Sequence, residues 1–185
     1  MIALVISFLV SVIVTLLLIR YKSLHQHLTG DHDLDGVQKF HSVVVPRVGG
    51  LSVFVGSLLG LLAKWFIDSD VSEPNLKLLA CALPVFFAGL IEDLTKVVGV
   101  KERLIGAVFS AALGGYFLGG WVTHIDIPFI DAFLGIPSIS FGGQDDIKVL
   151  SLLITCFAVA GVSNAFNLID GYNGLAGVVA VIILL

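Results

Sequence analysis

Charged side chains are scarce in this 185-residue sequence. Asp, Glu, Lys and Arg make up 13% of it, whereas a soluble domain carries about 25%. The net charge of −4 speaks against a nucleic-acid partner, which would need a basic surface. The chain has two cysteines, Cys81 and Cys156, both in apolar runs without C-x-x-C spacing, so neither a disulfide nor a zinc site is predicted. Hydrophobic residues reach 57%, which predicts an integral membrane protein.

Long apolar runs dominate what the sequence does contain. A bilayer core of about 30 Å requires roughly 20 apolar residues in a helix. The first run lacks the basic start and small-residue cleavage site of a signal peptide, so it is predicted to be a retained span. We predict an all-α, polytopic membrane helix bundle that forms one domain over residues 1–185, with about six spans: 2–19, 48–67, 78–91, 104–123, 149–169 and one that begins near Asn173. No polar flank closes the last span, which is typical of the front part of a longer protein.

The basic residues favour one orientation in the membrane. Seven of the ten Lys and Arg residues lie in the segments 20–47 and 92–103, on the same side of the predicted bundle. Because cytoplasmic loops are enriched in Lys and Arg, this side is predicted to be cytoplasmic and the N-terminus periplasmic. The segment 124–148 then lies outside. Pro128 and Pro137 prevent it from spanning, and the alternation in IDIPFIDAF predicts a short hairpin or a re-entrant piece.

Polar residues recur at three-residue intervals in the otherwise apolar stretch NAFNLIDGYNGLAG, residues 164–177: Asn164, Asn167, Asp170 and Asn173. On a helix the first three form one stripe about 9 Å long. Hydrogen bonding between helices is the ordinary explanation for such amides in membranes. An ionisable Asp170 at the edge of the hydrocarbon is costly, however, and this cost favours a functional site.

A pair of acids, Glu92 and Asp93, ends the apolar run of AGLIEDLTK. A span that simply ends in water would also carry acids there, so the pair alone decides nothing. Carboxylates are nevertheless the ligands that a hard cation such as Mg²⁺ needs, usually together with substrate phosphates. The predicted topology puts this pair and Asp170 on the same cytoplasmic face, so the three acids are predicted to form a metal site.

A third group of polar residues precedes the second span, in KFHSVVVPRVGG. Lys39, His41 and Arg47 come before the pair Gly49–Gly50. Cationic groups beside a glycine-rich helix start are suited to hold phosphate oxygens. Anchoring by the positive-inside rule explains Arg47 equally well. The sequence leaves both interpretations open.

The stretches NAFNLIDGYNGLAG, AGLIEDLTK and HSVVVPRVGG, in this order and spacing, resemble the motifs of the polyprenyl-phosphate N-acetylhexosamine-1-phosphate transferases, glycosyltransferase family 4. The PRVGG form is similar to the undecaprenyl-phosphate GlcNAc-1-phosphate transferase-like branch, which starts lipid-linked O-antigen, enterobacterial common antigen and teichoic-acid linkage synthesis. The resemblance implies a multi-pass enzyme of the bacterial inner membrane whose site faces the cytoplasm. It implies a reaction that depends on Mg²⁺, with Mn²⁺ as the alternative ion. In this reaction a UDP-amino sugar gives its sugar-1-phosphate to undecaprenyl phosphate, and UMP is released.

The resemblance also implies roles for residues. The family's paired acids correspond to Glu92 and Asp93, and the acid of its DG motif to Asp170. These three are the implied catalytic and metal-binding residues. The implied substrate-binding residues are Lys39, His41, Arg47, Asn164, Asn167 and Asn173. Glu92 departs from the Asp that the family usually has, and the family's later metal-binding Asp and His-rich element are missing from residues 1–185, so the chain is expected to hold about half of the catalytic apparatus.

Other functions stay open at this point. A non-catalytic remnant of such an enzyme, or a membrane assembly partner derived from one, would keep the same motifs. An ion or proton transporter would use Glu92, Asp93 and Asp170 as a relay. A relay predicts acids at several depths of the membrane, whereas these gather at one face. The sequence does not identify the UDP-sugar, and it leaves oligomerisation open.

Overall fold

The computed structural model describes residues 2–23, 47–68, 73–95, 98–134, 138–139, 147–169 and 174–184. The helices are α1 (Ile2–Arg20), α3 (Gly49–Asp68), α4 (Glu73–Thr95), α5 (Val100–Leu118), α6 (Pro128–Leu134), α7 (Val149–Ile169) and α8 (Leu175–Leu184). Two-residue strands β1 (Ser138–Ile139) and β2 (Ile147–Lys148) form one antiparallel pair. The predicted all-α bundle is therefore confirmed, apart from this short ladder.

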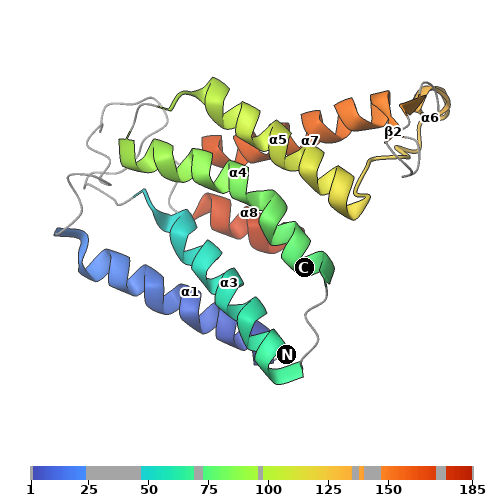
Figure 1. Cartoon of the computed structure of the whole chain (residues 1–185). Coiled ribbons are helices and arrows are strands. Elements are labelled where there is room, and N and C mark those ends of the chain that lie inside the picture. The colour runs from blue at the N-terminus through green and yellow to red at the C-terminus, as the bar shows by residue number, and fades with distance from the viewer. Residues whose placement is uncertain are drawn as a thin grey trace.

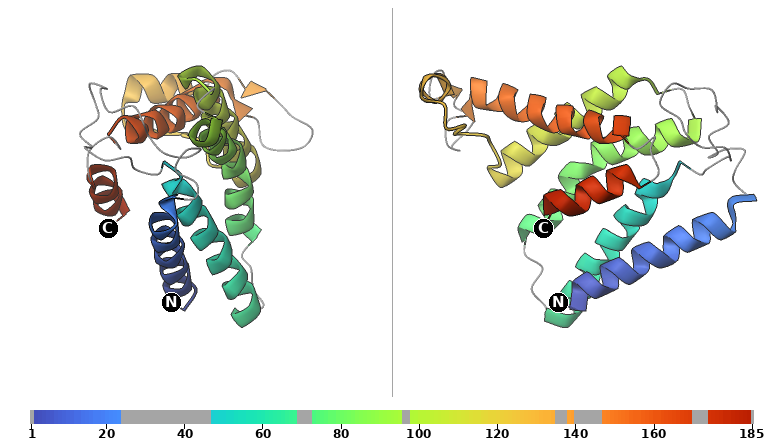
Figure 2. Two further views of the ribbon diagram at one scale, coloured as in Figure 1. Left: turned by 90° about the vertical axis from the view of Figure 1, so that its left-hand side faces the viewer. Right: turned by 180° about the vertical axis from the view of Figure 1, so that it is seen from behind.

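The long helices pack as consecutive antiparallel neighbours (Figure 1). Helix α1 lies along α3, α4 lies along α5, and α5 also lies along α7. The two groups meet where α3 touches α4, and there the rings of Phe54 and Phe86 stack with centroids 4.1 Å apart. Helix α8 stands apart from α1 and α3 and contacts α7 (Figure 2). The arrangement brings the ends of α1, α4 and α7 and the starts of α3 and α5 to one end of the bundle.

Small and hydroxyl-bearing residues occupy the helix contacts, and large apolar residues face outward. Among the described residues, the buried positions are almost all of the small kind: Ser52, Cys81, Ala107, Ser110, Ala111, Ser151, Thr155, Cys156 and Ala160, with Val48 and Leu134 beside them. By contrast, Phe66 is 80% exposed and Phe157 is 82% exposed. This distribution reverses that of a water-soluble core, and small residues at helix contacts are typical of membrane bundles. The protein is therefore a membrane protein.

Four of the described helices are long and apolar enough to cross a membrane: α1, α3 from Gly49 to Ile67, α4 and α7. The prediction of about six spans is not confirmed. The fourth predicted span, 104–123, corresponds to α5, which begins earlier and carries Lys101, Glu102 and Arg103 in its first turn. The sixth corresponds to α8, of which ten residues are described. The periplasmic placement of the N-terminus stays a prediction.

Helix α4 continues through a proline. Pro84 lies inside it and leaves the helical hydrogen-bond ladder incomplete. The backbone N–H of Val85 donates to the hydroxyl of Ser110 on α5, at 3.0 Å. Gly106 permits this approach, because a Cβ there would lie 3.0 Å from the Cβ of Ala88 and 3.4 Å from the carbonyl oxygen of Pro84. The neighbouring helix thus contacts the backbone of α4 directly after the proline.

The segment predicted as a hairpin or re-entrant piece contains both a helix and a strand pair. IDIPFIDAF forms most of α6 rather than a strand, because Pro128 is a favourable first helical residue. The strand pair lies further along the chain, with Ser138 opposite Lys148. Before α6, two hydrogen bonds hold the backbone of Val122 against α7. The N–H of Val122 donates to the hydroxyl of Thr155 at 2.9 Å, and the carbonyl of Val122 accepts from the hydroxyl of Ser151 at 2.6 Å.

Candidate functional site

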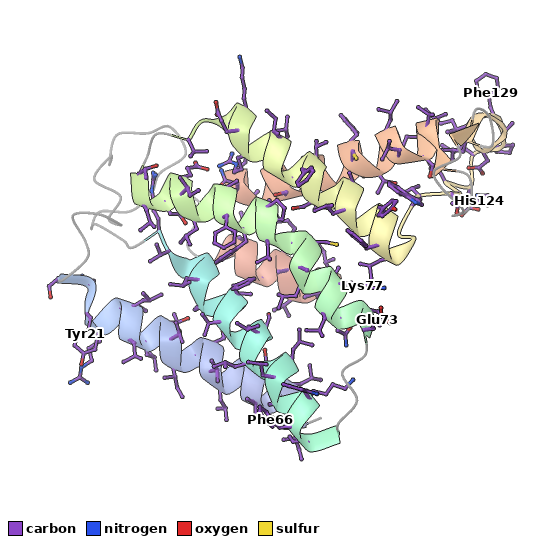
Figure 3. All side chains as sticks on the ribbon, in the orientation of Figure 1. Tyr21, Phe66, Glu73, Lys77, His124 and Phe129 are labelled. Carbon is purple, nitrogen blue, oxygen red and sulfur yellow. The ribbon has the colours of Figure 1, made fainter. Side chains whose placement is uncertain are left out.

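Polar residues from three helices meet at one end of the bundle. Figure 3 labels Tyr21 near this end, and Glu73, Lys77, His124 and Phe129 toward the opposite side. The last turn of α4, the first turn of α5 and the last turns of α7 come together here, close to the start of α3. Within the described residues, the acids of α4, Arg103 of α5 and the amides of α7 thus lie at the same end of the bundle.

The centre of this end is a hydrogen-bonded cluster of Glu92, Arg103 and Asn164. Nη1 of Arg103 donates to both carboxylate oxygens of Glu92, at 2.9 and 3.1 Å. Nη2 of Arg103 donates to the amide oxygen of Asn164 at 3.2 Å. One guanidinium group thus joins α4, α5 and α7. We call these three residues the Arg103 cluster.

The Arg103 cluster is largely withdrawn from solvent. The side chain of Arg103 is 12% exposed and that of Glu92 is 26% exposed. An ion pair in such a position is screened less than a surface pair, and charge-assisted hydrogen bonds are the stronger kind. The exposed pair of Lys77 and Glu73 at the start of the same helix, with side chains 41% and 77% exposed, provides the contrast. The local geometry at the site end is therefore fixed by charge as well as by packing.

A cavity of about 320 Å³ adjoins the Arg103 cluster. Arg103, Ser163 and Asn167 give it polar walls. Its other lining residues are Val85, Gly89, Phe166 and Ala176, so α4, α5, α7 and α8 all contribute. A Cβ at Gly89 would meet no atom within 4 Å, so the missing side chain leaves open space there. The cavity is suited to a ligand that is partly apolar and partly polar.

The remaining predicted site residues divide into two groups. Asp93 is half-buried in the last turn of α4, and Arg47 is half-buried directly before α3. Asn164 and Asn167, predicted to share a stripe, both face the neighbourhood of Arg103, one as its hydrogen-bond partner and one as a cavity wall. Four predicted residues lie outside the described part of the chain: Lys39, His41, Asp170 and Asn173.

The predicted metal site is tested only in part. Within the described ranges, no group of three or more His, Cys, Asp and Glu residues is arranged to hold a metal ion. The third predicted ligand, Asp170, lies outside those ranges. Both oxygens of Glu92 are engaged by Arg103. The carboxylate of Asp93 is chemically suited to Mg²⁺, which prefers oxygen ligands.

Sequence reasoning missed the role of Arg103, which it counted only as a cytoplasmic anchor. The sequence nevertheless contains a signal for the contact between Arg103 and Glu92. Glu92 lies three residues before the end of α4, and Arg103 lies three residues after the start of α5. Residues equally distant from a short connection lie at about the same level in an antiparallel helix pair. Opposite charges at such positions predict an ion pair.

The fold defines a polytopic membrane protein. The end of the bundle that holds the Arg103 cluster forms a polar, partly enclosed site beside an amphiphilic cavity. The family model described as glycosyl transferase family 4 matches residues 75–185, which is more than half of the chain. The chain belongs to this family, and the predicted resemblance is confirmed. No solved structure gives a significant match.

Curated relatives agree with the family. An undecaprenyl-phosphate alpha-N-acetylglucosaminyl 1-phosphate transferase from Yersinia pestis is 31% identical over 78% of this chain and 35% of its own length. A probable undecaprenyl-phosphate N-acetylglucosaminyl 1-phosphate transferase from Bacillus subtilis is 25% identical over 98% of this chain and 46% of its own length. A phospho-N-acetylmuramoyl-pentapeptide-transferase from Shouchella clausii is 28% identical over 70% of this chain and 39% of its own length. The chain thus matches less than half of the length of these relatives.

Proposed function

We propose that this chain carries part of the site of a transferase that moves a sugar-1-phosphate of the N-acetylhexosamine type from a UDP-sugar to undecaprenyl phosphate, releasing UMP. The family and its relatives support transfer of a sugar phosphate to a polyprenyl phosphate. The reaction would begin the synthesis of a lipid-linked cell-surface polysaccharide. We place it at the cytoplasmic face of the bacterial inner membrane, because seven of ten basic residues lie on that predicted side.

The observation that carries the proposal is the position of the Arg103 cluster beside the cavity. A polyprenyl phosphate has an apolar chain and an anionic head, and it stays in the bilayer. The cavity offers Val85 and Phe166 to apolar groups and Asn167 to polar ones. The acids of α4 lie at the same end, where a water-soluble nucleotide-sugar would meet the lipid head.

The chemistry requires charge compensation at this end. An oxygen of the lipid phosphate attacks the phosphorus that bears the sugar, a new phosphorus–oxygen bond forms, and the bond to the UMP phosphate breaks. Several anionic groups meet in this step, so cationic groups must offset their repulsion. Mg²⁺, with Mn²⁺ as the alternative, would supply part of this compensation when bound. Asp93 and Asp170, with Glu92, are the residues that would hold it, and Lys39, His41 and Arg47 would contact phosphate oxygens.

A reconstituted assay tests the proposal. Because residues 1–185 are expected to hold about half of the catalytic apparatus, the full product of the gene is placed in lipid vesicles with undecaprenyl phosphate, UDP-GlcNAc and MgCl₂, and both released UMP and lipid-linked sugar are measured. We expect the two products in equal amounts, with dependence on both substrates. The variant Asp170→Asn should lower the rate by about 10²-fold or more, because it removes one carboxylate charge at the proposed metal site. Equal rates for this variant and the unaltered chain would contradict the assignment of Asp170.

A further inference from the structure

We propose that Arg103 is a positioning residue, which holds Glu92 of α4 and Asn164 of α7 in one fixed arrangement across α5. The structural part of this inference rests on the hydrogen bonds alone. Its effect on catalysis rests on the proposed function. Arg103 touches none of the reacting groups in this role. It acts through the residues that it holds.

The geometry of the guanidinium carries the first step. Nη1 bonds both oxygens of Glu92, and Nη2 bonds the oxygen of Asn164. Because the group is planar and rigid, these contacts set the two partners relative to each other in direction as well as distance. The amide of Asn164 is oriented by the same contact, since its oxygen faces Arg103 and its NH₂ group must point elsewhere.

The placement of the charges carries the second step. Glu92 lies near the C-terminus of α4, where the dipole of that helix disfavours an anion. Arg103 lies near the N-terminus of α5, where the dipole of that helix disfavours a cation. The reversed pair would be favoured by both dipoles. Stability alone therefore does not account for the observed order of charges. A requirement for the acid on α4, next to Asp93, does account for it.

Glu92 and Asp93, the two acids of the pair, therefore have different roles in the site. Glu92 is held by Arg103, so its carboxylate anchors the last turn of α4. Asp93, the next residue on that turn, is placed by this anchor. Arg103 also forms part of the cavity wall together with Asn167, so the same contact fixes the polar side of the cavity.

Three variants test the inference: Arg103→Gln, Arg103→Lys and the charge reversal Glu92→Arg with Arg103→Glu. Each is made in the full product of the gene, purified in detergent for thermal unfolding and placed in vesicles for kinetics of UMP release. The matched control is Glu73→Gln, which breaks the exposed ion pair with Lys77 at the other end of α4. We expect the control to change the unfolding midpoint by less than about 2 °C and the rate by less than about twofold.

For Arg103→Gln we expect a midpoint lower by about 5 °C and a kcat lower by about 10²-fold. Arg103→Lys keeps the charge but loses the rigid fork, so its midpoint should stay close to that of the unaltered chain while kcat falls about tenfold with little change in KM. The charge reversal should restore the midpoint, because both dipoles favour it, without restoring kcat.

Different results would contradict the positioning role, the proposed function and the contact between Glu92 and Arg103. A wild-type kcat in Arg103→Lys would overturn the positioning role, and so would recovery of kcat in the charge-reversed chain. If the unaltered full product of the gene releases no UMP, the proposed function fails, and the unfolding midpoints then decide the structural part. A charge reversal that unfolds earlier than Arg103→Gln would show that Glu92 and Arg103 do not hold each other, whereas a restored midpoint would support the contact.

Discussion

At the scale of single residues, Glu92 is the predicted site acid whose contacts the structure shows directly. The family resemblance implies Asp here, and Glu is longer by one methylene. Both oxygens of the longer side chain accept hydrogen bonds from Nη1 of Arg103 on the neighbouring helix. The ion pair with Arg103 therefore holds this carboxylate against α5.

Two substitutions of Glu92 separate charge from length. Glu92→Asp keeps the charge and loses reach, whereas Glu92→Gln keeps the reach and loses the charge. Because Gln would leave the largely buried Arg103 without an anionic partner, we expect it to lower UMP release by about ten- to a hundredfold. Glu92→Asp should lower it less than tenfold. Kinetics in vesicles measure both, and identical rates for the two variants would show that charge at this position does not matter.

At the scale of elements, α4 and α5 show how the bundle tolerates a proline within a membrane span. Pro84 interrupts the ladder of α4, and the hydroxyl of Ser110 accepts the N–H of Val85. Ser110 is 8% exposed, so water cannot readily replace it. The contact therefore belongs to the stability of the α4–α5 pair rather than to the chemistry of the site.

Ser110→Ala tests this contact. Removing the hydroxyl removes the acceptor that this N–H has on α5, and loss of one hydrogen bond costs about 1 kcal/mol in the free energy of unfolding. The control is Ser57→Ala on α3, because the Ser57 hydroxyl donates to the carbonyl of Val53 in its own helix in an exposed position. Unfolding of both variants in detergent should show a loss for Ser110→Ala and little change for Ser57→Ala. Equal stability of the two variants would mean that the proline is accommodated in another way.

Apolar runs were sufficient to predict the long helices, but they did not predict their partners or their ends. Residues 2–19 and 149–169 coincide closely with α1 and α7. The first turn of α5 was missed because Lys101, Glu102 and Arg103 are polar, and the anionic partner of Arg103 lies on another helix. For the same reason the sequence identified Glu92 and Asn164 as site residues but not the arginine between them. Side-chain pairing across helices is tertiary information, which hydropathy does not contain.

At the scale of the whole molecule, the described chain is polarised along the bundle. The Arg103 cluster, Asp93 and Arg47 gather at one end, and Glu73, Lys77, His124 and Asp131 gather toward the other. Large apolar side chains cover the surface between the two ends. The function that we propose requires the first end to face the cytoplasm, where UDP-sugars are made. The orientation of the bundle is therefore a direct test of the site.

Single cysteines at the two ends report that orientation. The native thiols Cys81 and Cys156 are buried and should give a low background with a membrane-impermeant maleimide. Tyr21 is 50% exposed at the site end, and the side chain of Glu73 is 77% exposed toward the opposite end. We expect Glu73→Cys to react in intact cells, and Tyr21→Cys to react only after the inner membrane is permeabilised, because seven basic residues on the site side favour retention in the cytoplasm. The unaltered chain is the control for labelling of the native thiols. The reverse pattern would place the Arg103 cluster outside, away from any nucleotide-sugar, and would contradict both the predicted topology and the proposed transferase.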